Sequence, residues 1–494
     1  MKIAFIASFV PRKCGIATYT RDLSLEIHKK RIPISIFAME NPMIPTVYSP
    51  PTVKTIQQEK IADYQKVAKL LNFSSIDIVH LQHEFGLFGG ADGKYILELA
   101  RALKKPLIVT FHTVLLTPTE HQKYIIQELA RLARNVIIMD EVAKNRLEQV
   151  YGLNPSDSTF ILHGAPIVTM RKDKAKKIIR FSHAFVLLAN NLLSRNKGIE
   201  YAIEAVEKAV QEIPSLVFLI VGETHPLVKK TEGESYREKL VGLVKKLHLE
   251  KHVIFINKYL PLEELKIYLA AADVYITPYL DPQQITSGTL SYAIGAGKAC
   301  ISTEFIYAKD MLAKGRGMLV PFHDSNAIAK DLIALHKNPK NLKKLETNVS
   351  SLRKDMSWSR VAKKHILLYS KVLQLNDTQK VAKKFILTPL DVSYLSHLTD
   401  AVGVIQHTHH IIPDRKFGYS TDDNARALIV VSQLYKQHKT DDILKLIKLY
   451  VTFLKFAQGA NGKFHTFLNF NRSWDDTTDV TDPYGKAMWA LGFN

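Results

Sequence analysis

Two segments in the second half of the chain combine residue types that suit a phosphate. Lys197-Gly198 stands directly before a predicted helix, where a lysine can pair with a phosphate next to the N–H groups of a helix N-terminus. Residues 286–289, Thr-Ser-Gly-Thr, precede a second predicted helix and offer hydroxyls and small residues to a diphosphate. Each segment alone is also typical of an ordinary capped helix start. Because both follow strands of one predicted α/β unit, together they favour a shared diphosphate site.

The elements that would position these segments alternate regularly. Short apolar, β-branched runs alternate with longer amphipathic stretches, which predicts βαβ units and parallel sheets. In the first unit, strands are predicted at 2–8, 34–38, 76–81, 106–111, 135–140 and 159–162, and helices at 18–30, 57–71, 93–102 and 120–132. In the second unit, strands are predicted at 185–189, 216–221, 253–256, 274–277, 299–303 and 317–320, and helices at 198–212, 234–247, 262–271 and 290–296. The pattern restarts after the lysine-rich stretch 171–180. We therefore expect two Rossmann-like domains, 1–170 and 176–375, whose strand ends face one cleft.

The character of the chain changes after a long amphipathic helix predicted at 358–375. A polar linker is expected at 376–390, followed by a mostly helical domain at 391–494 in which strand-like runs vanish. The sequence stops just after the apolar run 487–491, so we expect this domain to be partial and the chain to be a fragment of a longer protein.

Net charge and apolar runs limit the possible partners. The formal charge of +20 favours anionic partners, namely nucleotide phosphates, lipid headgroups or nucleic acid, although a solvated lysine-rich surface explains it equally well. No RNP-type aromatic pattern, zinc finger or basic zipper is present, so nucleic acid is not expected. Peripheral contact with an anionic membrane stays open.

The length of the apolar runs and the cysteine content indicate the cellular compartment. No run reaches the roughly 18 apolar residues of a spanning helix, and the apolar start of the chain is interpreted as a buried strand rather than a signal peptide. Two cysteines are too few for a disulfide framework. We expect a cytoplasmic protein, with peripheral contact to the inner membrane face left open.

The order of several motifs resembles a known family. They are Gly-Ile-Ala-Thr-Tyr at 15–19, Val-His-Leu-Gln-His-Glu-Phe-Gly at 79–86, Thr-Phe-His-Thr at 110–113, Leu-His-Gly at 162–164, Ser-Arg-Asn-Lys-Gly at 194–198, Val-Gly-Glu at 221–223, Ala-Asp-Val at 272–274 and the segment 286–298. Their order is similar to that of the GT-B retaining glycosyltransferases called group 1 or family 4. The resemblance covers roughly residues 1–375.

The resemblance implies a role for each matching residue. Lys197 would neutralise the donor diphosphate, and His112 would contribute a hydrogen bond or charge beside the donor sugar. His83 and Glu84 would lie on the acceptor side of the cleft, with a structural hydrogen-bonded pair as the alternative. Other donor-binding residues would be Gly15, Arg195, Glu223, Ser287, Gly288, Thr289 and Tyr292.

Two departures from the family pattern concern the donor site. Gln284 and Tyr292 stand where the family usually has a pair of glutamates, and Gln284 can bind sugar hydroxyls but carries no negative charge. Leu192 stands where an arginine is common, and Arg195 is the candidate to compensate. A divergent subfamily and a loss of catalysis both explain these changes.

The expected activity is transfer of a hexose from UDP-hexose or GDP-mannose to a saccharide or a lipid-linked saccharide. Residues 1–375 contain no Asp-x-Asp pair, so no metal and no cofactor are expected, the nucleotide-sugar being a substrate. Lys197, Arg195 and helix N-termini would stabilise the departing diphosphate. The alternatives are another GT-B activity such as an epimerase or phosphorylase, an inactive carbohydrate-binding module, and a glycosidase-like activity in the helical domain.

The helical domain has acidic candidates of its own. Asp422, Asp423, Asp475 and Asp476 lie in segments that resemble the inner loops of an (α/α)-toroid, where paired carboxylates act on glycosidic bonds. The alternative is a solvated loop with aspartates that cap helices. His407, His409 and His410 lack the Cys or acidic framework of a metal site.

Overall fold

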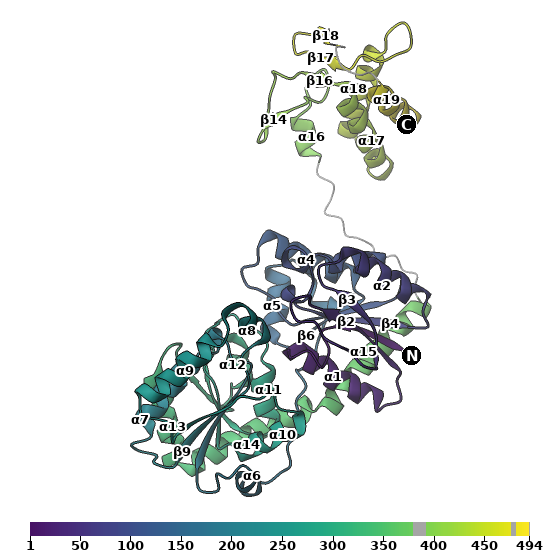
Figure 1. Ribbon diagram of the computed structural model, residues 1–494. Helices are drawn as coiled ribbons and strands as arrows, with labels where there is room; N and C mark the ends of the chain where they lie inside the picture. Colours follow the sequence, from purple (N-terminus) through teal and green to yellow (C-terminus); the bar gives the residue numbers. More distant parts are fainter. Residues whose placement is uncertain (379–391, 476–480, 494) are drawn as a thin grey trace. The chain divides into compact units, whose positions relative to one another are not determined.

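Two parallel β-sheets organise the first three quarters of the chain in the computed structural model (Figure 1). The structure describes residues 1–378, 392–475 and 481–493. The chain divides into two units, Met1–Lys380 and Val381–Asn494, and each is considered by itself. The predicted linker 376–390 lies outside the described residues except for 376–378, which continue a helix.

The first sheet has seven parallel strands in the order β3-β2-β1-β4-β5-β6-β7. The strands are β1 Ile3–Ala7, β2 Ile34–Glu40, β3 Thr52–Gln57, β4 Ile78–His83, β5 Leu107–Phe111, β6 Asn135–Ile138 and β7 Ser158–Phe160. The helices are α1 Gly15–His28, α2 Ile61–Phe73, α3 Ile96–Ala102, α4 Glu120–Leu132 and α5 Glu141–Gln149. Helices α2 to α5 cover one face, and α1 covers the other together with α15. Because both faces are covered, β1, β4 and β5 are buried along their whole length.

The second sheet has six parallel strands in the order β10-β9-β8-β11-β12-β13. The strands are β8 Phe185–Asn190, β9 Leu216–Val221, β10 Val253–Ile256, β11 Val274–Thr277, β12 Ala299–Thr303 and β13 Met318–Val320. The helices are α6 Lys172–Ile178, α7 Ile199–Ala209, α8 Pro226–Glu232, α9 Ser235–Lys246, α10 Leu262–Ala271, α11 Gly288–Gly295, α12 Ile306–Met311, α13 Ser325–Lys337 and α14 Pro339–Met356. This is the two-domain α/β architecture that the sequence predicts.

Helix α15, Trp358–Thr378, follows the second sheet in the chain but packs on α1 of the first domain (Figure 1). Its Trp358 ring lies so close to Gly164 that a Cβ on this glycine would be 2.1 Å from the indole. One apolar core therefore runs from the first sheet through α1 and α15 to the inner face of the second sheet.

Two segments contain an element that the sequence pattern did not predict. The helix predicted at 57–71 begins only at Ile61, because residues 52–57 form the edge strand β3. The sequence of β3 is largely polar, so a search for apolar runs does not detect this strand. The stretch 171–180, predicted as a boundary, contains helix α6. Its Ala175 is buried and its lysines Lys172 and Lys176 pair with Asp273, so that the positive charges are compensated.

The second unit is mainly helical. It contains α16 Ser393–His397, α17 Thr421–Gln437, α18 Asp441–Ala457 and α19 Thr481–Phe493, and α17 packs against both α18 and α19. The expectation of a mostly helical domain is confirmed. Two-residue strands also form antiparallel pairs among the described residues of this unit: β14 Thr408–His409, β15 Ile412–Pro413, β16 Tyr419–Ser420, β17 Phe467–Leu468 and β18 Trp474–Asp475. The toroid stays a prediction.

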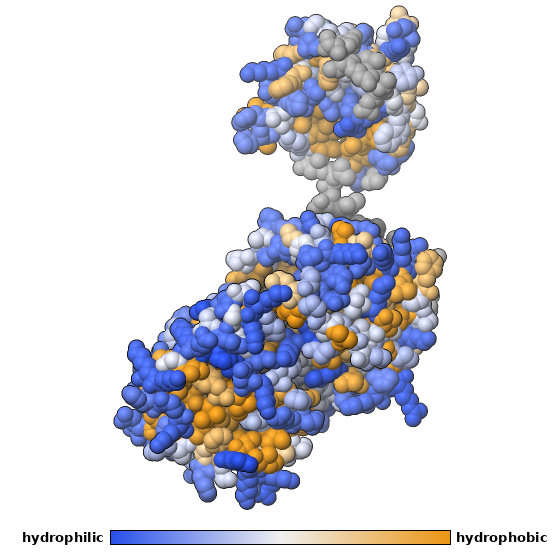
Figure 2. All heavy atoms as spheres, in the orientation of Figure 1, coloured by the Kyte–Doolittle hydropathy of each residue, from blue (hydrophilic) through white to orange (hydrophobic). Residues whose placement is uncertain are grey.

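Two features are relevant to membrane contact, the distribution of apolar side chains on the surface and the length and hydropathy of the helices. Figure 2 shows mainly hydrophilic side chains over the visible face of the first unit, with an apolar area at its end. Within the described ranges, no helix combines the length and the apolar character needed to cross a bilayer.

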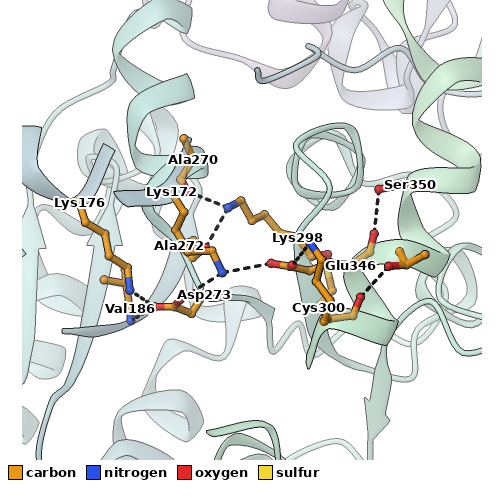
Figure 3. A network of polar contacts seen from close by, with 12 residues as sticks. Lys172, Lys176, Val186, Ala270, Ala272, Asp273, Lys298, Cys300, Glu346 and Ser350 are labelled. Carbon is orange, nitrogen blue, oxygen red and sulfur yellow. Dashed lines mark hydrogen bonds and ion pairs between the residues drawn. The ribbon is translucent and has the colours of Figure 1, made fainter. Parts of the chain in front are cut away.

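A partly buried network of charges ties α6 and α14 to the second sheet (Figure 3). Nζ of Lys172 lies 3.1 Å from carboxylate oxygens of both Asp273 and Glu346, and Lys176 pairs with Asp273 at 2.5 Å. Nζ of Lys298 donates to the backbone carbonyls of residues 270 and 272 at 2.7 and 3.0 Å. Burial lowers the pKa of Lys298 to about 7. The network thus holds the chain segment that links the two domains.

We predict that the stabilising effect of Lys298 depends on pH. Above pH 7 the unfolded chain keeps a proton on this lysine that the folded protein releases, so raising the pH favours the folded state. The free energy of unfolding of the wild type, minus that of Lys298→Met, should rise between pH 7 and 10 by up to about 1.4 kcal/mol per pH unit. Urea unfolding of both proteins checks this, with Lys251→Met, at an exposed lysine, as the control for the loss of one lysine charge. A constant difference for Lys298→Met would contradict the prediction.

Candidate active site

A cleft lies at the carboxyl ends of the strands of both sheets. It consists of two adjoining cavities of about 300 and 330 Å³, each within the range of small-molecule sites. Residues that border both cavities come from both domains: Gly15, Tyr19, His163, Lys197, Gln284, Thr286 and Gly288. The structure therefore brings together candidates that are up to 273 positions apart in the sequence.

The first cavity has the features of an anion site. Lys197 follows β8, and its Nζ lies 4.1 Å from the centroid of the Tyr279 ring. Within the described residues Lys197 makes no ion pair, so its charge is available to a ligand. Helix α11 begins at the same cavity. Ser287 caps it by accepting from the N–H of Leu290 at 3.3 Å, and the Thr289 hydroxyl bonds that of Tyr279 at 2.6 Å. The lysine and the helix N-terminus together suit a diphosphate.

His112 borders the second cavity as a neutral ring. Its Nε2 lies 2.9 Å from Oε1 of Gln82, and its backbone N–H donates to the carbonyl of His83 at 3.0 Å. Burial lowers the pKa of His112 to about 3. Of the two expected contributions, hydrogen bond or charge, the structure favours the hydrogen bond at neutral pH.

Glu84 also borders the second cavity, whereas His83 does not. The Glu84 carboxylate accepts from the Thr113 hydroxyl at 2.6 Å and from the Phe85 N–H at 3.0 Å, and burial raises its pKa. His83 lies fully buried, stacked on Phe88 at 5.9 Å between ring centroids. The expected cleft position of His83 is wrong, because neighbouring residues of a strand point to opposite faces and His83 points into the apolar layer.

Two expected donor-binding residues lie outside the cavity walls. Arg195 pairs with Glu232 at 3.1 Å and borders neither cavity, so its role beside the diphosphate stays a prediction. Glu223 also borders neither cavity and pairs with Lys13 of the first domain at 2.5 Å. Each of the two candidates thus has an ion-pair partner outside the two cavities, Glu232 for Arg195 and Lys13 for Glu223.

Gln284 and Tyr292, which stand where the family usually has glutamates, differ in their position relative to the cleft. Gln284 borders both cavities, and its Nε2 donates to the backbone carbonyl of Thr286 at 2.8 Å, which leaves Oε1 for a ligand. Tyr292 borders the first cavity, but its hydroxyl donates to Asp22 of α1 at 2.5 Å. This bond spans the two domains and leaves the Tyr292 oxygen only an acceptor role toward a ribose.

Several aromatic residues of the cleft are absent from the predicted site, among them Tyr19, His163 and Tyr259. Tyr19 and His163 border both cavities, with ring centroids 5.1 Å apart, and Tyr259 bonds the hydroxyl of Thr18 at 2.7 Å. Tyr19 and His163 lie inside quoted motifs, so the resemblance pointed to their segments without singling them out. Tyr259 carries no sequence signal of its own.

The acidic candidates of the second unit lie in different surroundings. The Asp422 carboxylate pairs with Arg426 at 2.5 Å and with Lys486 at 2.9 Å, and Asp423 lies in the first turn of α17, where the helix dipole favours acidic residues. Asp475 ends β18, and Asp476 lies outside the described residues. Within the described ranges, no group of three or more His, Cys, Asp or Glu side chains is arranged to hold a metal ion.

Comparison with known proteins decides the family. Residues 14–167 match the domain family described as Glycosyltransferase Family 4, and residues 170–351 match Glycosyl transferases group 1. The chain belongs to the group 1/family 4 glycosyltransferases. Phosphatidyl-myo-inositol mannosyltransferase of Mycobacterium tuberculosis is 24% identical to this glycosyltransferase over 319 residues, which cover 63% of this chain and 78% of the relative.

Solved structures show the same GT-B fold. Anabaena HepE in complex with UDP and glucose superposes with a TM-score of 0.60 at 16% identity, covering 75% of this chain and 100% of HepE. A glycosyltransferase from Rickettsia africae superposes with a TM-score of 0.61 at 15% identity, covering 76% of this chain and 98% of that chain. At these identities the likeness concerns the fold alone.

Two glycines of the glycosyltransferase provide a prediction that separates fold from binding. A Cβ at Gly198, where φ is 59°, would lie 2.1 Å from the Pro278 carbonyl oxygen, whereas a Cβ at Gly15 meets nothing within 4 Å. Gly198→Ala should lower the free energy of unfolding by about 2 kcal/mol or more. Gly15→Ala should change it by less than about 0.5 kcal/mol and weaken nucleoside diphosphate binding about tenfold, because the methyl group narrows the cavity.

Urea unfolding and calorimetric titration with UDP and GDP measure the two effects. Full affinity in folded Gly15→Ala would show that the ligand does not approach this loop.

Proposed function

We propose that this glycosyltransferase moves a hexose from UDP-hexose or GDP-mannose to a hydroxyl of a saccharide or a lipid-linked saccharide, with retention and without a metal. One observation carries the proposal: Lys197, the N-terminus of α11, Gln284 and His112 meet in one cleft. The first two suit the diphosphate. Gln284 and His112 suit the sugar, which would lie between the diphosphate and the wall that the first domain forms around His112.

The electrostatic part of the mechanism rests on Lys197 and α11. Negative charge develops on the diphosphate as its bond to the sugar breaks, and prearranged donors that meet this charge lower the barrier. Lys197 supplies a full charge and the first turn of α11 supplies N–H groups around Gly288. With Arg195 paired to Glu232, the lysine carries this task without the arginine.

Retention follows when the acceptor attacks from the side on which the diphosphate leaves. The bond between the anomeric carbon and the phosphate oxygen breaks, and the acceptor oxygen bonds to the same carbon. The acceptor proton passes to the leaving phosphate oxygen, so that no protein base is needed. The low pKa of His112, which burial lowers to about 3, agrees with a hydrogen-bonding role for this ring.

The relatives support the choice of substrates. HepE is described in complex with UDP and glucose, and the mycobacterial relative by its name transfers mannose to a phosphatidyl-inositol. Both descriptions agree with a nucleotide-hexose donor, and the second favours a lipid-linked acceptor. The net charge of +20 suits peripheral contact with the cytoplasmic face of an anionic membrane.

A matched pair of variants tests the proposal. Lys197→Ala should lower kcat/KM at least about a hundredfold, because it removes the charge facing the diphosphate, whereas Arg195→Ala should change it less than about threefold. The assay follows nucleoside diphosphate release from UDP-, GDP- and ADP-hexoses with EDTA present, alongside thermal shifts for each nucleotide.

The other outcomes separate the alternatives. Stabilisation by one nucleotide series without release over many hours would favour an inactive binding module, in keeping with the engagement of Tyr292 by Asp22. Turnover that EDTA abolishes would contradict metal independence, and no shift with any nucleotide would contradict the donor site.

A further inference from the structure

A line of buried polar side chains runs from helix α15 to the cleft. Nε2 of His112 lies 2.9 Å from Oε1 of Gln82, Nε2 of Gln82 lies 3.1 Å from Nε2 of His80, and Nδ1 of His80 lies 2.7 Å from the hydroxyl of Tyr369. The exposed fraction is 7% for His112 and 0% for the other three. Of these residues, only His112 borders a cavity.

The amide of Gln82 gives this line a direction. The Gln82 amide is oriented with Oε1 toward His112 and Nε2 toward His80. An amide oxygen only accepts and an amide nitrogen only donates, so in this orientation Nε2 of His112 carries a hydrogen and Nε2 of His80 accepts one. His80 then donates from Nδ1 to the oxygen of Tyr369. Burial lowers the pKa of both histidines, so each ring carries a single hydrogen. Nδ1 of His112 is therefore left with a lone pair.

This lone pair matters in a cleft where positive charge develops on a sugar. A pyridine-type nitrogen presents partial negative charge, which stabilises an oxocarbenium-like carbon, whereas an N–H group at the same place opposes it. The tautomer of His112 thus affects the rate of transfer more than the affinity for the donor. Gln284 contributes no negative charge to the same cavity, which increases the importance of this nitrogen.

We propose that Gln82 is a positioning residue: it holds the hydrogen of His112 on Nε2, with His80 and Tyr369 behind it, so that Nδ1 faces the donor sugar as an acceptor. The proposal rests on the proposed function for the part that concerns the sugar. Helix α15 takes part in the active site through this line, although Tyr369 does not border the cleft.

Histidine tautomers give a direct test that needs no substrate. In protein labelled with ¹⁵N-histidine, long-range ¹H–¹⁵N spectra distinguish N–H nitrogens from lone-pair nitrogens, and loss of signals in His112→Asn assigns this ring. We expect Nε2 of His112 to be of the N–H type in the wild type. In Gln82→Met, and in Tyr369→Phe, which removes the acceptor of His80, a second tautomer of His112 should appear.

Thr110→Val is the matched control. The Thr110 hydroxyl bonds Nε2 of His80 at 2.7 Å but can donate or accept, so it sets no direction, and its removal should leave the tautomer of His112 unchanged. Thermal unfolding of each variant confirms that it is folded. A wild-type His112 with its hydrogen on Nδ1, or an unchanged tautomer in both Gln82→Met and Tyr369→Phe, would overturn the proposal.

Kinetics tests the consequence for transfer. Gln82→Met should lower kcat about tenfold, the effect of about one hydrogen bond, while KM for the nucleotide-sugar and the affinity for the nucleoside diphosphate stay within about twofold. A changed tautomer with an unchanged kcat would overturn the link to transfer. If the wild type turns over no nucleotide-sugar, the proposed function fails, and the tautomer spectra still decide whether Gln82 positions His112.

Discussion

Burial of both faces of each sheet is the constraint on which the rest of this structure depends. Strands such as β1, β4 and β5 have no solvent-facing side, so the polar groups that can contact a ligand lie beyond their carboxyl ends. Glu84 and His112 directly follow β4 and β5, and Lys197 follows β8 after a short loop. Two sheets whose carboxyl ends face each other then bring these side chains into one cleft.

The cleft and the arrangement of the two domains depend on the same side chains. One apolar core extends through both domains, and around it polar bonds cross between them, including Asp22 with Tyr292 and Arg146 with Gln283 at 2.6 Å. Tyr292 borders the first cavity and Gln283 the second. A change in the relative position of the domains would therefore change the walls of the binding site. Because the cavity walls depend on the domain arrangement, a bound donor would stabilise the arrangement in which the walls fit it.

Histidines in this cleft contribute hydrogen bonds and shape rather than charge. Burial lowers the pKa of His112 to about 3 and that of His163 to about 4, so both rings are neutral at physiological pH. Their function then depends on which ring nitrogen carries the hydrogen. The residues behind the ring decide which nitrogen carries the hydrogen. A buried chain of hydrogen bonds can fix this choice, because a buried polar atom without a partner would cost free energy.

Periodicity and motif order in the sequence were sufficient for the two sheets, for a helix such as 262–271 to the residue, and for the family. They also identified Lys197, Gln284 and His112, which border the cleft. The polar edge strand β3 and the helix inside 171–180 were missed, because local patterns record apolar burial and neither segment has much of it.

Only the tertiary structure decided which candidates face the cleft and which partners they have. Arg195 meets Glu232, Tyr292 meets Asp22 across 270 positions, and His83 faces the apolar layer while Gln82 supports His112. The spacing of apolar residues along a helix or strand determines which of its faces is buried. The partner of a buried polar group depends on side chains that only folding brings near, and desolvation then decides its charge and its hydrogen bonds.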